Sequence, residues 1–199
     1  MTMKSPIRVF AALGVPIFWT LFLVLPAAVP IGAQESTVHK DVPYVPTPPE
    51  VVEAMLKLGN ASPSDIHYDL GCGDGRIVVM ALQKFGARRA TGYDINPERI
   101  KEANENAKQA GVNDKARFIL GNLFEADFRD ASIVTLYLLP DVNLKLRPKL
   151  LKDLKVGSRI VSNQFDMGDW EPDKKITLDW RNVYLWVVTE KSKAQFAAK

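Results

Sequence analysis

The 199-residue chain contains one cysteine and two histidines. With Cys72 alone, no intrachain disulfide can form, and its spacing to other residues matches no metal site. His39 lies in a proline-rich stretch and His67 within a predicted strand, so neither is a good general base. The sequence therefore predicts neither a disulfide scaffold nor a metal centre, and it has no internal repeat or low-complexity segment.

Net charge is also nearly absent from most of the chain. The formal net charge is +3, but two basic residues, Lys4 and Arg8, stand in an N-terminal segment without acids. From residue 34 onward, 24 basic residues face 23 acidic ones. A body this close to neutral lacks the basic footprint of a nucleic-acid-binding protein, so nucleic acid is not an expected partner.

The first 33 residues form a separate unit with two possible interpretations. No charged residue stands between Arg8 and Glu35, and the apolar run from Val9 to Val29 is about long enough to span a bilayer. Lys4 and Arg8 favour a cytoplasmic N-terminus, which would place the remaining chain on the outer side. A cleaved secretory signal ending near Ala33 fits the same pattern. The protein is thus expected to be membrane-anchored through residues 1–33, or exported.

An alternation of strands and helices follows a proline-rich linker or arm at residues 34–48. We expect a single catalytic domain at 49–199, with a parallel sheet, helices on both faces and a C-terminal antiparallel hairpin turning at Arg181-Asn182. Pro148 is expected to kink or break the last long helix. The predicted helices are 49–59, 75–86, 96–111 and 141–154, and the predicted strands are 65–71, 89–95, 116–122, 132–139, 158–165, 175–180 and 183–190.

The stretch DLGCGDGR, residues 69–76, ends the first strand and opens a helix. Glycines at 71, 73 and 75 allow a sharp turn and the close approach of a ligand, toward which the next helix directs its free N–H groups. The spacing G-x-G-x-G differs from the dinucleotide fingerprint G-x-G-x-x-G. Asp69 and Asp74 would repel a phosphate. They suit a cationic ligand such as S-adenosylmethionine, which carries an α-ammonium and a sulfonium.

Further ligand contacts are expected at the ends of the next two strands. Asp94 ends strand two, where a carboxylate accepts both hydroxyls of a ribose, and Ile95 follows it. Asn122 and Leu123 follow strand three, where an adenine ring should lie. Asn122 is equally explained as a turn residue. The predicted cofactor site also includes the backbone around Cys72.

These motifs resemble those of class I S-adenosylmethionine-dependent methyltransferases. The segments VPYVPTPPEVVEAMLKLG, TLYLLPDVNLKLRPKL and LKVGSRIVSNQFDMGDW are more closely similar to archaeal broad-specificity protein lysine methyltransferases and to mitochondrial membrane-anchored lysine methyltransferases. The resemblance covers about residues 42–190. It implies a Rossmann-like, seven-stranded, mostly parallel sheet. It also implies that Tyr44 and Thr47 fold over the cofactor, although packing of an extended arm explains Tyr44 nearly as well.

The acceptor site is expected after strand four. Enzymes that methylate planar amines often carry Asn/Asp-Pro-Pro-Tyr there, whereas this chain has Tyr137-Leu138-Leu139-Pro140. We therefore predict a lysine side chain of a protein as the acceptor, with Tyr137 and Pro140 as catalytic-site residues; core packing is the alternative for Tyr137. Phe165, Asp166 and Trp170 are expected on the same rim.

Two other functions stay open from the sequence. One is a nicotinamide-dinucleotide oxidoreductase, against which the glycine spacing and Asp74 argue. The other is a non-catalytic, membrane-tethered binding protein with the same fold, because the expected orientation would separate the domain from cytosolic S-adenosylmethionine. The expected partners are a protein substrate with an accessible lysine, membrane proteins included, and the membrane itself, with the protein acting as a monomer.

Overall fold

The computed structural model describes residue 2 and residues 44–196. The chain divides into two units, residues 1–36 and 37–199. The predicted anchor or signal at residues 1–33 lies outside the described residues, apart from residue 2. Among the helices that are described, none combines the length and the apolar character needed to cross a membrane.

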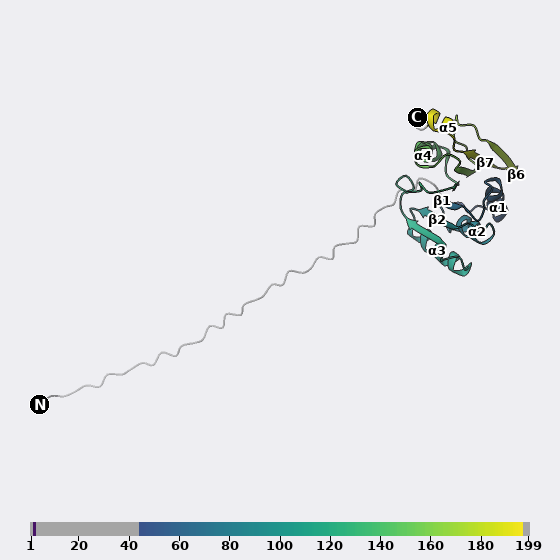
Figure 1. The fold of residues 1–199 in the computed structure, drawn as a ribbon. Helices are drawn as coiled ribbons and strands as arrows, with labels where there is room; N and C mark the ends of the chain where they lie inside the picture. The colour runs from purple at the N-terminus through teal and green to yellow at the C-terminus, as the bar shows by residue number, and fades with distance from the viewer. Residues whose placement is uncertain (1, 3–43, 197–199) are drawn as a thin grey trace. The chain divides into compact units, whose positions relative to one another are not determined.

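Strands and helices alternate along the described domain as the sequence predicts (Figure 1). Seven strands form one sheet in the order β3-β2-β1-β4-β5-β7-β6. The pairs among β1 to β5 are parallel, and β7 is antiparallel to both β5 and β6. The elements are α1 (Pro49–Leu58), β1 (Ile66–Leu70), α2 (Arg76–Gln83), β2 (Arg89–Asp94), α3 (Pro97–Gln109), β3 (Ala116–Leu120), β4 (Ile133–Leu136), α4 (Pro140–Asp153), β5 (Arg159–Asn163), β6 (Lys174–Leu178), β7 (Arg181–Val187) and α5 (Glu190–Phe196).

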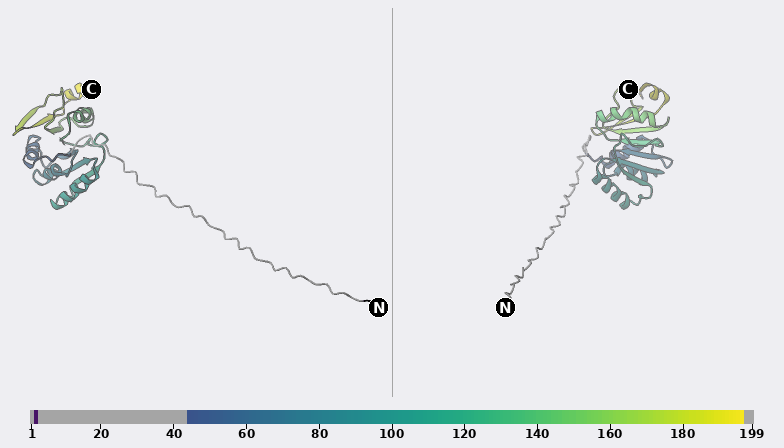
Figure 2. Two further views of the ribbon diagram at one scale, coloured as in Figure 1. Left: turned by 180° about the vertical axis from the view of Figure 1, so that it is seen from behind. Right: turned by 90° about the vertical axis from the view of Figure 1, so that its left-hand side faces the viewer.

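The core lies in two layers, one on each face of the sheet. Neighbouring residues of a strand point to opposite faces, so Ile133 and Val134 of β4 belong to different layers. One layer holds the apolar sides of α1 and α2 with part of α3, and the other holds that of α4. Figures 1 and 2 show this arrangement, with α4 and α5 across the strands from α1, α2 and α3.

The strand order reverses between β1 and β4. From β1 the chain proceeds outward to β2 and β3, and then returns to the other side of β1 as β4. Ligands of such sheets bind beyond the carboxyl ends of the strands at this point of reversal. The ends of β1, β2 and β4 are therefore where the fold expects a site.

The helix α4 runs through Pro148 without ending, so the expected break is wrong. Proline removes one helical hydrogen bond and costs about 3 kcal/mol or more. Leu146, Leu150 and Leu151, on both sides of Pro148, are fully buried against the sheet. Burying such a side chain contributes about 1.5–3 kcal/mol each, so the packing of this face outweighs the lost hydrogen bond.

The C-terminal hairpin forms as predicted, but its turn lies two residues earlier than expected. Leu178 pairs with Arg181, so Asp179 and Trp180 make the turn, and Arg181 and Asn182 belong to β7. Asp179 has a φ of 52°, a conformation that aspartate tolerates better than most residues. The sequence analysis also missed α5, whose residues show no clear apolar period.

Candidate active site

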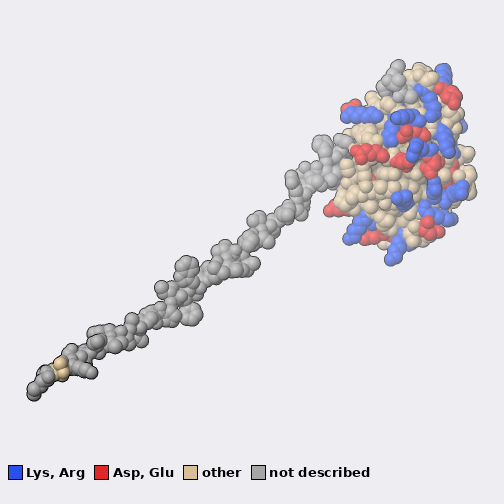
Figure 3. Space-filling model, turned by 60° about the vertical axis from the view of Figure 1, so that its left-hand side comes forward, with Lys and Arg blue, Asp and Glu red and all other residues tan. Residues whose placement is uncertain are grey.

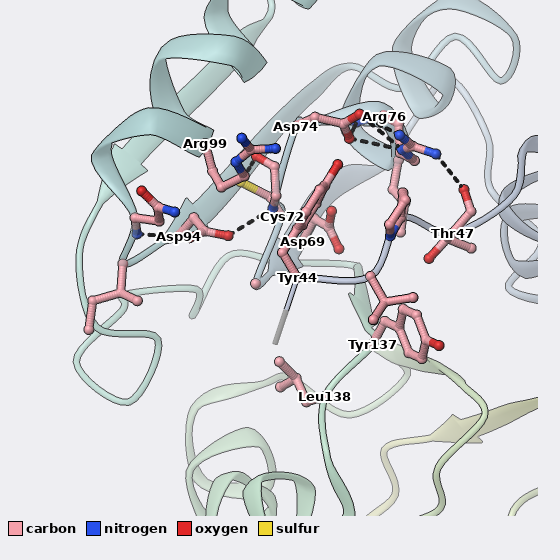
Figure 4. A pocket seen from close by; sticks show the side chains of 17 residues that line it. Tyr44, Thr47, Asp69, Cys72, Asp74, Arg76, Asp94, Arg99, Tyr137 and Leu138 are labelled. Carbon is pink, nitrogen blue, oxygen red and sulfur yellow. Dashed lines mark hydrogen bonds and ion pairs between the residues drawn. The ribbon is translucent and has the colours of Figure 1, made fainter. Parts of the chain in front are cut away.

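A pocket of about 150 Å³ lies at the carboxyl ends of β1, β2 and β4. It is lined by the end of β1, the glycine loop, the residues after β2, the residues after β4 and the arm that precedes α1 (Figure 4). Nine of the twelve predicted cofactor residues line it: Tyr44, Thr47, Asp69, Gly71, Cys72, Gly73, Asp74, Asp94 and Ile95. The predicted acceptor residue Tyr137 lines it too.

The glycine loop is held in its turn by backbone geometry and by α3. Gly73 has a φ of 52° and donates its N–H to Oδ2 of Asp94, at 2.8 Å. Asn106 of α3 donates its side-chain amide to the carbonyl of Asp74, at 2.9 Å. A Cβ on Gly73 would lie 2.4 Å from Cε2 of Tyr44. The loop thus requires glycine at the floor of the pocket, where the Tyr44 ring stands directly over it.

Asp74 is neutralised within the protein. The guanidinium of Arg76 donates to both carboxylate oxygens of Asp74, from Nε at 2.9 Å and from Nη2 at 2.6 Å. Burial alone would raise the pKa of Asp74, but the Arg76 guanidinium outweighs it and holds that pKa below its ordinary value. Nη1 of Arg76 also donates to the carbonyl of Thr47, at 2.9 Å. Arg76 therefore links the glycine loop to the arm, and Asp74 is not a free partner for a ligand cation.

Asp69 is a deeply buried carboxylate of the pocket that has no charged partner among the described residues. It is 2% exposed, and its Oδ1 accepts a hydrogen bond from the Thr135 hydroxyl at 2.7 Å. Its Oδ2 has no hydrogen-bond partner among the described residues, although Asp69 lines the pocket. Burial, with the nearby Asp94 and Asp74 adding to it, raises the pKa of Asp69 to about 7. A buried, unpartnered oxygen facing a pocket suits a ligand that brings a positive charge.

Asp94 at the end of β2 organises the backbone on both sides of the pocket. Its Oδ2 accepts from the N–H of Gly73, and its Oδ1 accepts from the N–H of Asn96 at 2.9 Å. Asn96 in turn caps α3 by accepting from the N–H of Glu98. Each carboxylate oxygen has two lone pairs, so Asp94 retains acceptor capacity for two hydroxyl groups.

Aromatic rings stand at the mouth of the pocket. Tyr137 lies beyond the end of β4, is half-buried, and stacks on Phe165 with 6.3 Å between ring centroids. Tyr44 is covered by the guanidinium of Arg99, 4.6 Å from its centroid. Trp170, expected on this rim, instead packs in the core against Trp186. Its indole is therefore not a wall of the pocket.

Three predicted cofactor residues and one predicted acceptor residue do not line the pocket. Gly75 has a φ of 77° and precedes α2, where a Cβ would meet the ring of Phe118. Oδ1 of Asn122 accepts from the N–H of Phe124, which is the turn role considered for it. Leu123 packs against the core, and Pro140 begins α4 beside a separate surface pocket. A cofactor role for Asn122 and Leu123 stays a prediction.

Two arginines and a hydrogen-bond chain in the site were not predicted from the sequence. Arg76 was visible as the last residue of DLGCGDGR, but the motif does not show that Arg76 pairs with Asp74. Arg99 comes from α3, and its approach to Tyr44 depends on where the arm lies. Thr135 lies opposite Asp69 only because β1 and β4 are neighbours, 66 residues apart in sequence.

The pocket fits S-adenosylmethionine. Asp69 offers an unpaired acceptor to a cation, Asp94 can receive a ribose, and the glycine loop leaves no Cβ in the way. A doubly wound sheet with these features defines the S-adenosylmethionine-dependent methyltransferases of the Rossmann-like class. Within that class, residues 69–174 match the ANTKMT methyltransferase domain, and the chain belongs to this family.

Named relatives and one solved structure are similar over most of the domain. A protein-lysine N-methyltransferase of Saccharolobus islandicus is 47% identical over 153 residues, which is 75% of this chain and 95% of that protein. The adenine nucleotide translocase lysine N-methyltransferase of Mus musculus is 36% identical; the match covers 71% of this chain and 61% of that protein. A structure described as an RNA methyltransferase of Salinibacter ruber, in complex with S-adenosyl-L-homocysteine, is 51% identical, with a TM-score of 0.72, over 73% of this chain and 95% of that one.

Proposed function

We propose that this methyltransferase modifies lysine side chains of proteins, and that the pocket at the ends of β1, β2 and β4 is where donor and acceptor meet. The observation that carries the proposal is the rim after β4. An aromatic ring, Tyr137, and an apolar side chain, Leu138, face the pocket there, in place of an amide or acid that would hold a planar amine. The similarity to a lysine methyltransferase over 95% of that relative's length supports it.

In this proposal the chain's own residues position the donor. Asp69 receives the α-ammonium, Asp94 receives the ribose hydroxyls, and Tyr44 and Thr47 of the arm cover the methionine end. When bound, the donor supplies a methyl group on a positively charged sulfur. The protein's contribution is to align a nucleophile with that methyl group and to keep water out, which supplies much of the rate in such displacements.

The acceptor must lose a proton before it reacts. A free lysine has a pKa of about 10.4. A partly apolar channel disfavours its ammonium form, and so does the positive charge of the donor. No dedicated base is then required, and among the described residues no histidine lines the pocket. Tyr137 is placed to pack along the lysine stem and to accept a hydrogen bond from the amine.

Replacing Tyr137 by alanine is expected to lower kcat about tenfold and to change the Kd for the cofactor less than threefold, because the ring orients the acceptor. Tyr137→Phe is the matched control, since it keeps the ring stacked on Phe165 and removes only the hydroxyl. If both variants lose the same activity, the hydroxyl carries the effect. Wild-type turnover in Tyr137→Ala would remove the residue from the acceptor site.

RNA is the second candidate acceptor, because the solved relative at 51% identity is described as an RNA methyltransferase. Binding to RNA relies on basic patches that neutralise phosphates. On the face shown in Figure 3, acidic and basic side chains are interspersed, with no continuous basic stripe. From residue 34 onward the charges nearly balance. These observations favour protein as the acceptor.

The substrate test is transfer of radiolabelled methyl from S-adenosylmethionine by the full chain into a membrane-protein extract and, separately, into total RNA. We expect label on lysine, identified by mass spectrometry, with a rate that rises between about pH 7 and 9 as the amine deprotonates. Label confined to RNA would overturn the lysine proposal and leave the methyltransferase activity standing. No label in either fraction, despite tight cofactor binding, would favour a tethered binding protein.

We also propose that residues 1–33 anchor the domain to a membrane, or direct its export if they are cleaved. The support is the uncharged run between Arg8 and Glu35 and the similarity to an enzyme named for the adenine nucleotide translocase. A domain anchored in this way would favour substrates close to the bilayer.

A further inference from the structure

A chain of three buried polar side chains runs inward from the pocket between β1 and β4. The Thr135 hydroxyl donates to Oδ1 of Asp69 at 2.7 Å, and the ring Nε2 of His67 lies 2.9 Å from the same hydroxyl oxygen. His67 and Asp69 are two residues apart on β1 and share a face, while Thr135 is paired with Asp69 across the sheet. All three side chains are at most 2% exposed.

The direction of this chain follows from counting protons. Burial lowers the pKa of His67 to about 4, so its ring is neutral and carries one proton. A hydroxyl has a single proton, and Thr135 uses it to donate a hydrogen bond to the Asp69 carboxylate. Its oxygen can then accept a hydrogen bond from Nε2–H of His67. In this arrangement, every member from His67 to Asp69 favours the charged form of Asp69.

The other oxygen of Asp69 has no such support. Oδ2 lacks a partner among the described residues and belongs to a side chain that lines the pocket. Neither pocket arginine is available to it, because Arg76 is engaged by Asp74 and Arg99 lies over Tyr44. Besides His67 and Arg99, the titratable and charged groups around Asp69 are Asp94 at the end of β2, Cys72 and Asp74 of the glycine loop, Arg76 of α2, Tyr44 and Tyr137.

We infer that Thr135 and His67 are positioning residues that hold Asp69 as a carboxylate with Oδ2 directed to the cofactor's α-ammonium, so that cofactor binding requires Asp69 to be deprotonated. This inference rests on the proposed placement of the cofactor in the pocket. An ammonium stabilises the carboxylate, whereas a protonated Asp69 offers it little. Binding then displaces the proton from that fraction of molecules in which Asp69 carries one.

The sign of the pH dependence follows. The pKa of Asp69 is about 7 in the free protein and falls when a cation binds. Affinity is therefore highest near pH 7.5, where Asp69 is mostly ionised, and it declines as the pH falls. Between about pH 7.5 and pH 6, the Kd should rise roughly tenfold, and close to one proton should be released per ligand bound near pH 6.

The test is calorimetric titration of the full chain with S-adenosylhomocysteine, which keeps the α-ammonium, in two buffers of different ionisation enthalpy. The ligand's own amine stays largely protonated below about pH 7.5 and is the same in every titration. Thr135→Val removes the hydroxyl at nearly constant volume. It should raise the pKa of Asp69, weaken binding about fivefold near pH 7, and move the decline in affinity to higher pH.

Thr135→Ser is the matched control, because it keeps the donor, and it should reproduce the wild-type profile. His67→Phe should shift the profile in the same direction as Thr135→Val, by a smaller amount. Superimposable profiles for wild type and Thr135→Val would overturn the inference, as would the loss of the wild-type profile in Thr135→Ser. If the valine variant does not fold, the wild-type protein still provides a test. Binding of the ligand by the wild type near pH 6 without release of a proton would by itself overturn the inference. Failure of the wild type to bind at any pH would instead contradict the proposed cofactor site.

Discussion

Replacing Gly73 by valine is expected to weaken binding of S-adenosylhomocysteine at least 100-fold in a calorimetric titration. Two physical effects act together at this position. The φ of 52° lies in the left-handed region, which costs a residue with a Cβ about 1–2 kcal/mol. A Cβ would also lie 2.4 Å from the Tyr44 ring, inside the pocket. Because the ring must move and the valine methyl groups occupy the ligand's space, binding should suffer far more than folding.

Gly157 offers a matched control for the backbone strain. Its φ is 89°, and no atom outside its immediate neighbours lies within 4 Å of a Cβ built there. Gly157→Val should therefore lower the free energy of unfolding by about the same 1–2 kcal/mol and leave the Kd unchanged. Equal Kd values for the two variants would show that Gly73 does not approach the ligand. If Gly73→Val unfolds and Gly157→Val does not, Gly73 is required for the backbone turn rather than for the approach of the ligand.

The parts of this structure that sequence predicted are those set by local patterns. The glycines at 71, 73 and 75 punctuate a strand and a helix, and all three have positive φ, as such a turn requires. Asn96 and Pro97 mark the start of α3 through short-range chemistry. The mostly apolar stretch around Ile133, in which Thr135 is polar, predicts a strand buried on both faces, and all four residues of β4 are buried.

The parts that sequence missed depend on contacts between distant segments. A proline inside a helix usually breaks it, but in α4 the packing of the buried leucines around Pro148 keeps the helix continuous. Asp74 looked available to a ligand because its local sequence does not show the geometry of Arg76. The hydrogen bond from Thr135 to Asp69 exists only after β4 returns beside β1. Burial and pairing of this kind determine charge states, and they arise only when the chain is folded.

Replacing Asp94 by alanine is expected to weaken S-adenosylhomocysteine binding by about 10- to 100-fold. Hydrogen bonds to a charged partner contribute about 1.5–3 kcal/mol, and Asp94 is the carboxylate proposed to receive both ribose hydroxyls. The substitution also releases the N–H groups of Gly73 and Asn96, so the glycine loop loses one side-chain tether while it keeps that of Asn106. Both effects act on the Kd in the same direction.

Asp127→Ala separates the ligand contact from the loss of a turn. Oδ1 of Asp127 accepts from the N–H of Arg129, two residues on, just as Asp94 accepts from Asn96, but Asp127 does not line the pocket. This control should bind the cofactor like wild type. Asp94→Asn gives a second comparison. The amide oxygen of the asparagine can still accept from one backbone N–H, while its NH₂ group is a donor and faces the other backbone N–H, which is also a donor. Affinity should therefore fall for the asparagine variant nearly as far as for alanine, because only a carboxylate accepts from both N–H groups and the ribose together. Wild-type affinity in Asp94→Ala would exclude Asp94 from the ribose site and move the search for that acceptor to the residues after β3.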